Sequence, residues 1–330
     1  MTGSDWSQQT ERGSPLWVGV IGWIVQTIGW RAGRLLLPGI TAWFYVRSAP
    51  ARAASRAYLT RALGRPATAF DVFRHIFTFA GAIMERVFLL SGRTEAFDIQ
   101  ITGLEALEAL VAAGRGCVLL GAHFGSFEAL RHLRNTCPVP VKALMYRNNA
   151  GALTRLLDAL DPTLADSIIE IGDARSMLRV HEAVSGGAIV GMLADRSPAG
   201  VRSIPATFFG EEALFPVGPL IVAATLGCPV LTFCGVRLGA RRYHITFTPF
   251  ADRVVLQRGA TRQAALAGHV QRYAAWLEAE CRAAPFNWFN FYPFWEGQDA
   301  APNPIMAAGG HPAGESARTT GPNPGGVPAD

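Results

Sequence analysis

The sequence predicts an α/β fold: a mostly parallel sheet flanked by helices, preceded by a membrane-associated helical segment. From Phe97 onward, short β-rich runs alternate with segments of helical period. Such alternation is typical of parallel sheets covered by helices on both faces. Half of the 330 residues are hydrophobic, which is enough for a large core. No GxGxxG, GxxxxGK or GxSxG pattern is present, so nucleotide-binding and α/β-hydrolase folds lack their usual marks.

The N-terminal region divides into a polar stretch, residues 1–15, and a hydrophobic segment, residues 16–46. We expect the polar stretch to be flexible. The hydrophobic segment opens with fifteen uncharged residues, Leu16 to Trp30, about 22 Å of helix, whereas roughly 20 residues span a bilayer. Further along, Pro38 and Gly39 are expected to break or kink any helix.

Five of the eight tryptophans fall in the first 43 residues, close to Arg31 and Arg34. Aromatic residues near arginines are typical of segments at the headgroup level of a membrane. We therefore predict that residues 16–46 associate with a membrane; the alternative is a pair of helices buried against the domain. Asp5 and Glu11 precede the apolar run and no compact basic region does, which disfavours a cleaved signal peptide and favours a cytoplasmic main domain.

The rest of the chain is predicted as one domain, residues 47–298, helical over 47–96 and α/β over 97–298, followed by a disordered tail, residues 299–330, rich in Pro, Gly, Ala and Ser. Helices are expected at 51–63, 69–90, 104–113, 126–135, 150–160, 173–185, 215–227 and 260–283. Strands are expected at 97–102, 117–121, 141–146, 167–171, 188–193, 204–209, 229–236 and 243–249.

Composition argues against nucleic-acid binding, disulfide bonds and a metal site. The net charge of +5 suits an anionic surface or partner, but no Arg/Lys block, zinc-finger spacing or RNP-like strand points to nucleic acid. The five cysteines include no CxxC pair and are expected to be reduced core residues. Without HExxH or paired cysteines, we expect no metal site, and nothing in the sequence implies an organic cofactor.

The stretch "GAHFGSFEALRHL", residues 121–133, predicts a candidate catalytic pair at the end of a strand. With His123 in the turn and Glu128 in the first helical turn, the carboxylate can reach back to the imidazole. His123 would then be a general base oriented by Glu128, at the edge where open α/β sheets bind ligands. Free N–H groups near Gly125 and Ser126 would stabilise an oxyanion. The alternative is a histidine merely satisfied by a nearby carboxylate.

The block "GAHFGSFE" resembles the HxxxxD/E block of the lysophospholipid acyltransferase superfamily, in the glutamate form used by the lipid A late acyltransferases. Three more stretches follow in that branch's order and with roughly its spacing: 187–198, 204–231 and 242–250. The resemblance covers about residues 15 to 296. The ending "FNWFNFYPFW" looks more like the predicted glycolipid-type acyltransferases found beside aryl polyene genes.

The resemblance implies a glycerolipid acyltransferase-like fold, with His123 as catalytic base and Glu128 as its partner. It places Arg147 near the active site, where a guanidinium would hold a phosphate or a phosphopantetheine group; a surface arginine is the alternative. Asp195 and Arg196 fall where the branch has an Asp-Gln or similar pair. The arginine departs from that pattern, and a plain salt bridge is the alternative to a role in holding the acceptor headgroup.

The segment "ATFFGEEALFPVGP", residues 206–219, lies beside the active site in the family. Phe209, Gly210 and Pro216 in it are expected to bind substrate by walling an acyl-chain groove, unless they are simply core.

The resulting expectation is an O-acyltransferase at the cytoplasmic face of the cell inner membrane. It would move an acyl chain from an acyl carrier protein or acyl-CoA to a hydroxyl of a lipid or glycolipid. The rivals are a thioesterase that uses the same His–Glu pair, and a non-catalytic accessory protein of a lipid pathway.

Overall fold

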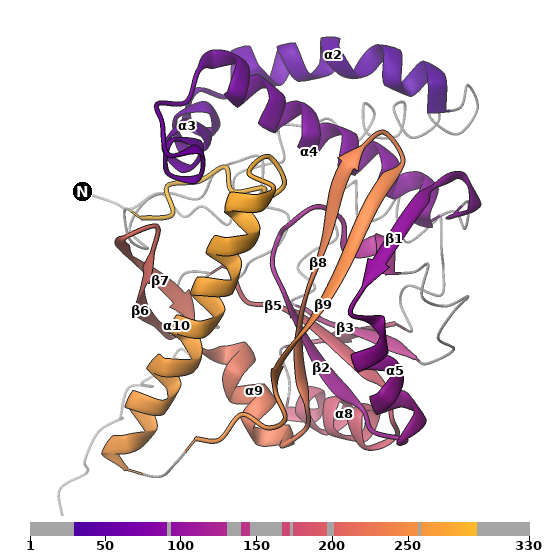
Figure 1. Cartoon of the computed structure of the whole chain (residues 1–330), viewed down its shortest axis with the longest axis vertical. Coiled ribbons are helices and arrows are strands. Elements are labelled where there is room, and N and C mark those ends of the chain that lie inside the picture. Colours follow the sequence, from indigo (N-terminus) through magenta and orange to yellow (C-terminus); the bar gives the residue numbers. More distant parts are fainter. Residues whose placement is uncertain are drawn as a thin grey trace, which may run out of the picture.

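The computed structural model describes residues 30–90, 94–130, 140–145, 167–171, 174–196, 201–256 and 259–295. Three predictions fall outside the described residues: the flexible stretch 1–15 with the first part of the hydrophobic segment, up to residue 29; the helix at 150–160; and the disordered tail, residues 299–330. Figure 1 shows the arrangement: a twisted central sheet, helices beside it, and a layer formed by the helices before the first strand over one end.

Within the part of the chain that the structure describes, the central sheet has seven strands in the order β1-β9-β8-β2-β5-β3-β4. Neighbours pair in parallel except for β8 and β9, which form an antiparallel hairpin. The prediction of a mostly parallel sheet is confirmed. The strands span Asp98–Thr102 (β1), Cys117–Gly121 (β2), Val141–Met145 (β3), Ile168–Glu170 (β4), Ile189–Leu193 (β5), Val230–Gly239 (β8) and Arg242–Ala251 (β9).

Both faces of this sheet are covered, and strand β2 shows how. All five of its residues are buried, because alternate side chains enter two different hydrophobic clusters. Val118 and Leu120 join the cluster that includes side chains of α9 and α10, whereas Cys117 and Leu119 join the one with α4 and α5. The helices beside the sheet are Leu104–Ala112 (α5), Ala174–Ser185 (α8), Gly218–Leu226 (α9) and Ala260–Ala283 (α10).

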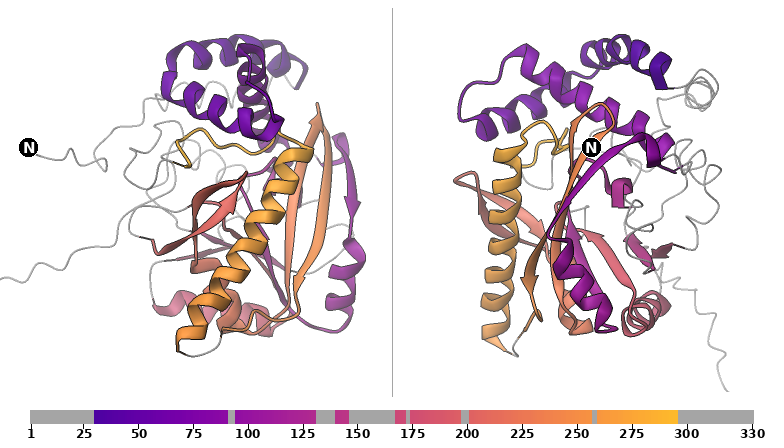
Figure 2. Two further views of the ribbon diagram at one scale, coloured as in Figure 1. Left: turned by 60° about the vertical axis from the view of Figure 1, so that its left-hand side comes forward. Right: turned by 45° about the vertical axis from the view of Figure 1, so that its right-hand side comes forward.

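The N-terminal helices form a layer over the end of the sheet to which β2 and β8 run (Figures 1 and 2). They are Trp30–Arg47 (α2), Ala49–Leu63 (α3) and Ala69–Leu90 (α4). Helix α4 matches the predicted 69–90 segment. Among the described residues, no helix is both long and apolar enough to cross a bilayer.

Helix α2 does not break at Pro38, one of the two outcomes expected there: it continues through this residue. A proline removes one backbone hydrogen bond and crowds the preceding turn, which usually breaks a helix. Here Gly33, Leu37 and Thr41, spaced four residues apart, form the buried stripe of α2, which packs on α4. Packing of this stripe holds the helix together across the lost bond.

A second, two-stranded sheet was not expected. Ser203–Phe208 (β6) and Glu211–Pro216 (β7) form an antiparallel hairpin, whereas the sequence pattern predicted a helix from residue 215. Phe209 and Gly210 turn the hairpin, both with positive φ (55° and 79°). The predicted helix at 126–135 is corrected over its described part, where residues 127–130 form a 3₁₀ turn; residues 131–135 lie outside the described residues.

A buried ion pair ties the helical layer to the β8–β9 hairpin. Glu85 of α4 is fully buried and accepts hydrogen bonds from Arg237 Nε at 2.7 Å and Nη2 at 2.9 Å, and from the Tyr243 hydroxyl at 2.7 Å. Gly81, one turn earlier, leaves room for the guanidinium, since a Cβ there would lie 2.8 Å from it. Such a satisfied network fixes α4 over the strand ends.

Candidate active site

His123 lies in the loop after β2, at the carboxyl end of a central strand. This loop needs a glycine at position 125, where φ is 61° and an added Cβ would lie 1.8 Å from the carbonyl oxygen of Gly235. The backbone therefore passes very close to β8. The close approach fixes the path of the chain on either side of Gly125.

The segment after α10 also holds this loop. Phe124 and Trp288 form an antiparallel bridge. Phe289 N–H donates to the carbonyl of His123 at 2.9 Å, and Gly125 N–H donates to that of Asn287 at 2.8 Å. The loop is thus built into a small piece of backbone pairing, which positions the His123 side chain more firmly than a free loop would.

The carboxylate bonded to His123 is that of Asp195, not that of Glu128. Imidazole Nδ1 lies 2.9 Å from Asp195 Oδ1, and the His123 backbone N–H donates to Oδ2 at 3.0 Å. A proton on Nδ1 satisfies this contact and leaves Nε2 free of its proton, ready to accept one. The side chain of Asp195 is 1 % exposed and that of His123 is 32 % exposed. The pair therefore has a buried acid and an accessible base.

The parallel register explains this partner. Gly121 of β2 pairs with Leu193 of β5, so the residues two positions beyond each strand, His123 and Asp195, come side by side. The sequence pointed to Asp195 only through a family position for the acceptor headgroup. The signal that identifies it as the partner is an acid two residues after the neighbouring parallel strand.

Glu128 has other partners. One of its carboxylate oxygens, Oε1, forms an ion pair with Arg86 of α4 at 2.6 Å, although the guanidinium Nε–H is poorly directed for a hydrogen bond. The other, Oε2, accepts a hydrogen bond from the Ser126 hydroxyl at 3.1 Å. The expected contact of Glu128 with the imidazole is therefore replaced by a link between the loop that carries His123 and the helical layer. Arg86 was not anticipated from the sequence.

The surroundings lower the pKa of both His123 and Asp195, which keeps the imidazole neutral and the carboxylate charged. Burial lowers the pKa of His123, as does the positive charge of Arg196, and the neighbouring Asp195 only partly opposes this. Burial alone would raise the pKa of Asp195, but His123 and Arg196 hold it below its usual range. Near neutral pH the acid is charged and the imidazole is neutral.

The predicted oxyanion donors are already used. Gly125 N–H bonds the carbonyl of Asn287, and Ser126 N–H donates to that of Gly235 at 2.9 Å. Both N–H groups are therefore engaged by backbone carbonyls in the structure, which disfavours the expected role in binding a developing negative charge. The accepting carbonyls, those of Asn287 and Gly235, are more than a hundred residues away in the sequence, so a local pattern could not reveal these bonds.

Arg196 does lie at the site. Its Nη2 donates to the carbonyl of Phe289 at 3.2 Å, in the segment that holds His123, and its charge acts on the imidazole. Arg147 lies outside the described residues, so its predicted contact with a phosphate stays a prediction.

The three other predicted substrate residues belong to the β6–β7 hairpin. Pro216 is buried at the end of β7, while Gly210 is exposed and lines a surface pocket of about 360 Å³ with Thr207, Gln271 and Glu278. Polar residues form much of that lining, which disfavours an acyl chain there. The Phe209 ring lies 4.8 Å from the guanidinium carbon of Arg282 on α10.

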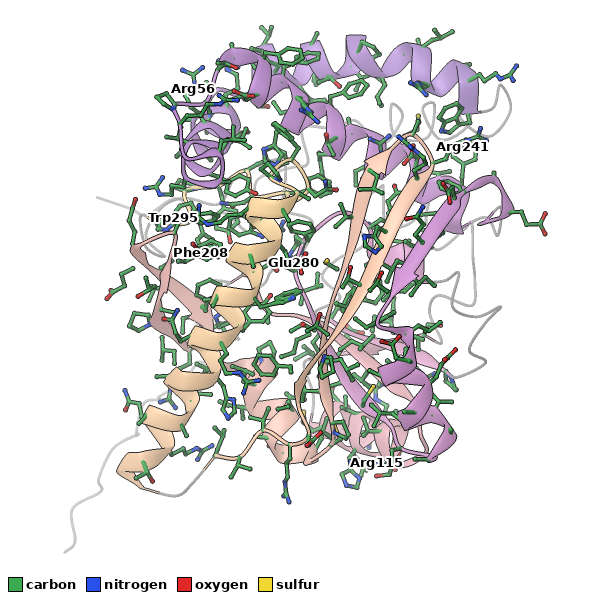
Figure 3. All side chains as sticks on the ribbon, in the orientation of Figure 1. Arg56, Arg115, Phe208, Arg241, Glu280 and Trp295 are labelled. Atoms are coloured by element: carbon green, nitrogen blue, oxygen red, sulfur yellow. The ribbon has the colours of Figure 1, made fainter. Side chains whose placement is uncertain are left out.

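The hairpin reaches the site through an aromatic cluster. Phe208 is fully buried, and its ring centre lies 5.4 Å from that of Trp288 and 5.6 Å from that of Trp295. Figure 3 shows Phe208 and Trp295 between the hairpin and the upper end of α10. These rings are core residues, and they support the segment that holds His123.

Comparison with known proteins gives one family. A family model described as bacterial lipid A biosynthesis acyltransferase matches residues 1–296. No match was found among curated proteins.

Proposed function

Because the chain belongs to the bacterial lipid A biosynthesis acyltransferase family, we propose that it moves an acyl chain from a thioester to a hydroxyl of a lipid or glycolipid. The observation that carries this proposal is the His123–Asp195 pair, a buried carboxylate holding an accessible imidazole at the carboxyl edge of the sheet. The donor is an acyl carrier protein or acyl-CoA. The reaction takes place at the cytoplasmic face of the inner membrane.

Transfer needs no nucleophile from the protein. Nε2 of His123 takes the proton of the acceptor hydroxyl as its oxygen attacks the thioester carbonyl, giving a tetrahedral oxyanion. Collapse of this intermediate forms the ester and expels the thiolate, which takes the proton back from the imidazolium. The charge of Asp195 keeps Nδ1 protonated and stabilises the imidazolium between the two steps.

Arg196 supplies the positive charge for the oxyanion. Its charge already reaches His123, and the backbone N–H groups of Gly125 and Ser126 are occupied. A guanidinium in a largely buried site stabilises negative charge far more than it would in water.

The dependence of transfer on pH follows from the lowered pKa of His123. The base works only when neutral, so kcat/KM is expected to stay constant from neutral pH down past the ordinary histidine value of about 6.5 and to fall only below it. A steady-state pH profile with a saturating co-substrate measures this. An acidic limb centred above 6.5 would contradict the assignment of His123.

The outer face of α2 supports membrane association. Leu35, Trp43 and Val46 of this helix are 82 %, 57 % and 72 % exposed. Exposed apolar side chains on one surface mark a contact with lipid or protein. Charge favours an anionic bilayer: residues 12–70 contain eight Arg and no Asp or Glu, whereas the rest of the chain has 22 Arg or Lys against 25 Asp or Glu. One of these arginines, Arg56, lies on α3 in the layer of N-terminal helices (Figure 3).

The double substitution Leu35→Ser and Val46→Ser is expected to weaken binding to phosphatidylglycerol-containing vesicles at least about tenfold, because each buried apolar side chain contributes about 1.5–3 kcal/mol. Co-sedimentation measures it. The control is Leu178→Ser with Val255→Ser, a matched pair 58 % and 57 % exposed elsewhere on the domain. Equal loss in both double variants would contradict the assignment of this face.

The reaction itself is tested with purified protein, acyl carrier protein or CoA carrying a labelled acyl chain, and an extracted lipid fraction. The proposal predicts label in a heavier lipid and little free fatty acid. Label released as free acid at the same rate with and without lipid would instead identify a thioesterase. No turnover of either kind, with folded protein and lipid present, would favour the accessory protein.

A further inference from the structure

Trp288 touches the candidate site in a way that neither the family nor the sequence pattern assigned. It is 1 % exposed, and its indole Nε1–H donates to Asp195 Oδ2 at 2.9 Å. Indole N–H groups inside proteins are usually satisfied by whatever acceptor is near. Here the acceptor is the carboxylate bonded to His123.

Three donors share the Asp195 carboxylate. Nδ1 of His123 serves Oδ1, while the backbone N–H of His123 and the indole of Trp288 both serve Oδ2. A buried carboxylate stays charged only when such donors replace water. Among the described residues, Trp288 supplies the one side-chain bond to it besides the imidazole. Together with the two His123 donors, the indole fixes the rotation of the carboxylate about its Cβ–Cγ bond.

The tryptophan is itself held on both sides. Its carbonyl lies 2.9 Å from Nε2 of His75, whose Nδ1 lies 2.8 Å from the Ser55 hydroxyl. Burial lowers the pKa of His75 to about 4, so this histidine is neutral under ordinary conditions, with Nε2–H donating and Nδ1 accepting. The Trp288 ring also packs at 4.9 Å from Tyr58 and 5.0 Å from Phe294.

We propose that Trp288 is a positioning residue for acyl transfer, which sets the orientation of Asp195 and through it the imidazole of His123. This inference rests on the proposed function. It assigns a role in the reaction to the C-terminal segment that packing alone would not require.

The test is Trp288→Phe, which keeps an aromatic ring and removes the N–H. Trp295→Phe is the matched control, because Trp295 belongs to the same ring cluster but its Nε1–H donates to the carbonyl of Phe208 at 3.3 Å. We expect Trp288→Phe to lower kcat about tenfold, with little change in KM for the thioester, since a hydrogen bond to a charged group is lost. The control is expected to stay within about twofold of wild type.

The pH profile separates positioning from packing. Without the indole N–H, the negative charge of Asp195 is less stabilised by hydrogen bonds and attracts the imidazolium more strongly. The pKa of His123 therefore rises. The acidic limb of kcat/KM is therefore expected to move to higher pH in Trp288→Phe and to stay in place in Trp295→Phe. Equal rates and equal limbs in the two variants would overturn the inference.

A measurement on the unsubstituted protein covers the case in which Trp288→Phe does not fold. In ¹H–¹⁵N spectra of the full chain, one indole N–H signal is expected to titrate together with His123 and to stop titrating in His123→Ala. No such signal would overturn the role of Trp288. If instead His123→Ala transfers acyl chains at the wild-type rate, the proposed function itself fails, so the two failures are distinguishable.

Discussion

Replacing His123 by alanine is expected to lower the acyl-transfer rate about 10²- to 10⁴-fold, the usual cost of removing a general base. The alanine leaves Asp195 in place but removes the group that takes the proton from the acceptor hydroxyl. The rate of labelled ester formation under single-turnover conditions measures the effect.

Two controls accompany this variant. Because the His123 side chain is 32 % exposed, water can take the place of its Nδ1–H at Asp195, and the backbone pairing of the loop is kept, so the substitution should lower the unfolding temperature only modestly. His181→Ala, at an exposed position on α8, is the matched substitution and should transfer normally. Wild-type activity in His123→Ala would remove His123 from the mechanism.

Asp195→Asn is expected to be almost as costly as the loss of His123, because asparagine keeps the shape but presents no negative charge to the imidazole. In the serine-protease triad the corresponding change costs about 10⁴-fold, since the histidine takes the wrong tautomer. Glu128→Gln is expected to cost less than His123→Ala and less than Asp195→Asn, because Glu128 bonds Arg86 and Ser126.

The order of the three rates decides which carboxylate serves the base. Single-turnover transfer should fall slightly in Glu128→Gln and strongly in Asp195→Asn and His123→Ala. If Glu128→Gln were instead as slow as His123→Ala while Asp195→Asn remained fast, Glu128 would be the partner of His123 during turnover, despite its place in the structure.

Much of the fold follows from local pattern. The strand at 117–121 and the helices at 69–90 and 260–283 agree with the structure because hydrophobic period, glycine and proline mark them within a few residues. Strand β7 was missed because "EEALFP" carries too few β-branched residues, and its pairing with β6 decides its conformation.

The site was only half predictable for a related reason. His123 stands out in its own loop, whereas Asp195 becomes its partner through the register of β2 and β5, a contact between distant parts of the chain. The same holds for the carbonyls of Asn287 and Gly235, which occupy the expected oxyanion donors. Local spacing pointed to His123 as the candidate base but not to the groups that orient it.

The most direct test of the central claim is comparative lipid mass spectrometry on membranes from cells carrying the native gene neighbourhood. Wild-type protein and His123→Ala are expressed at equal level and checked for folding. Acyl transfer predicts a lipid or glycolipid heavier by one acyl group in the wild type and absent in the variant, and its mass gives the chain and the acceptor. Identical lipid profiles with both proteins present and folded would contradict the account.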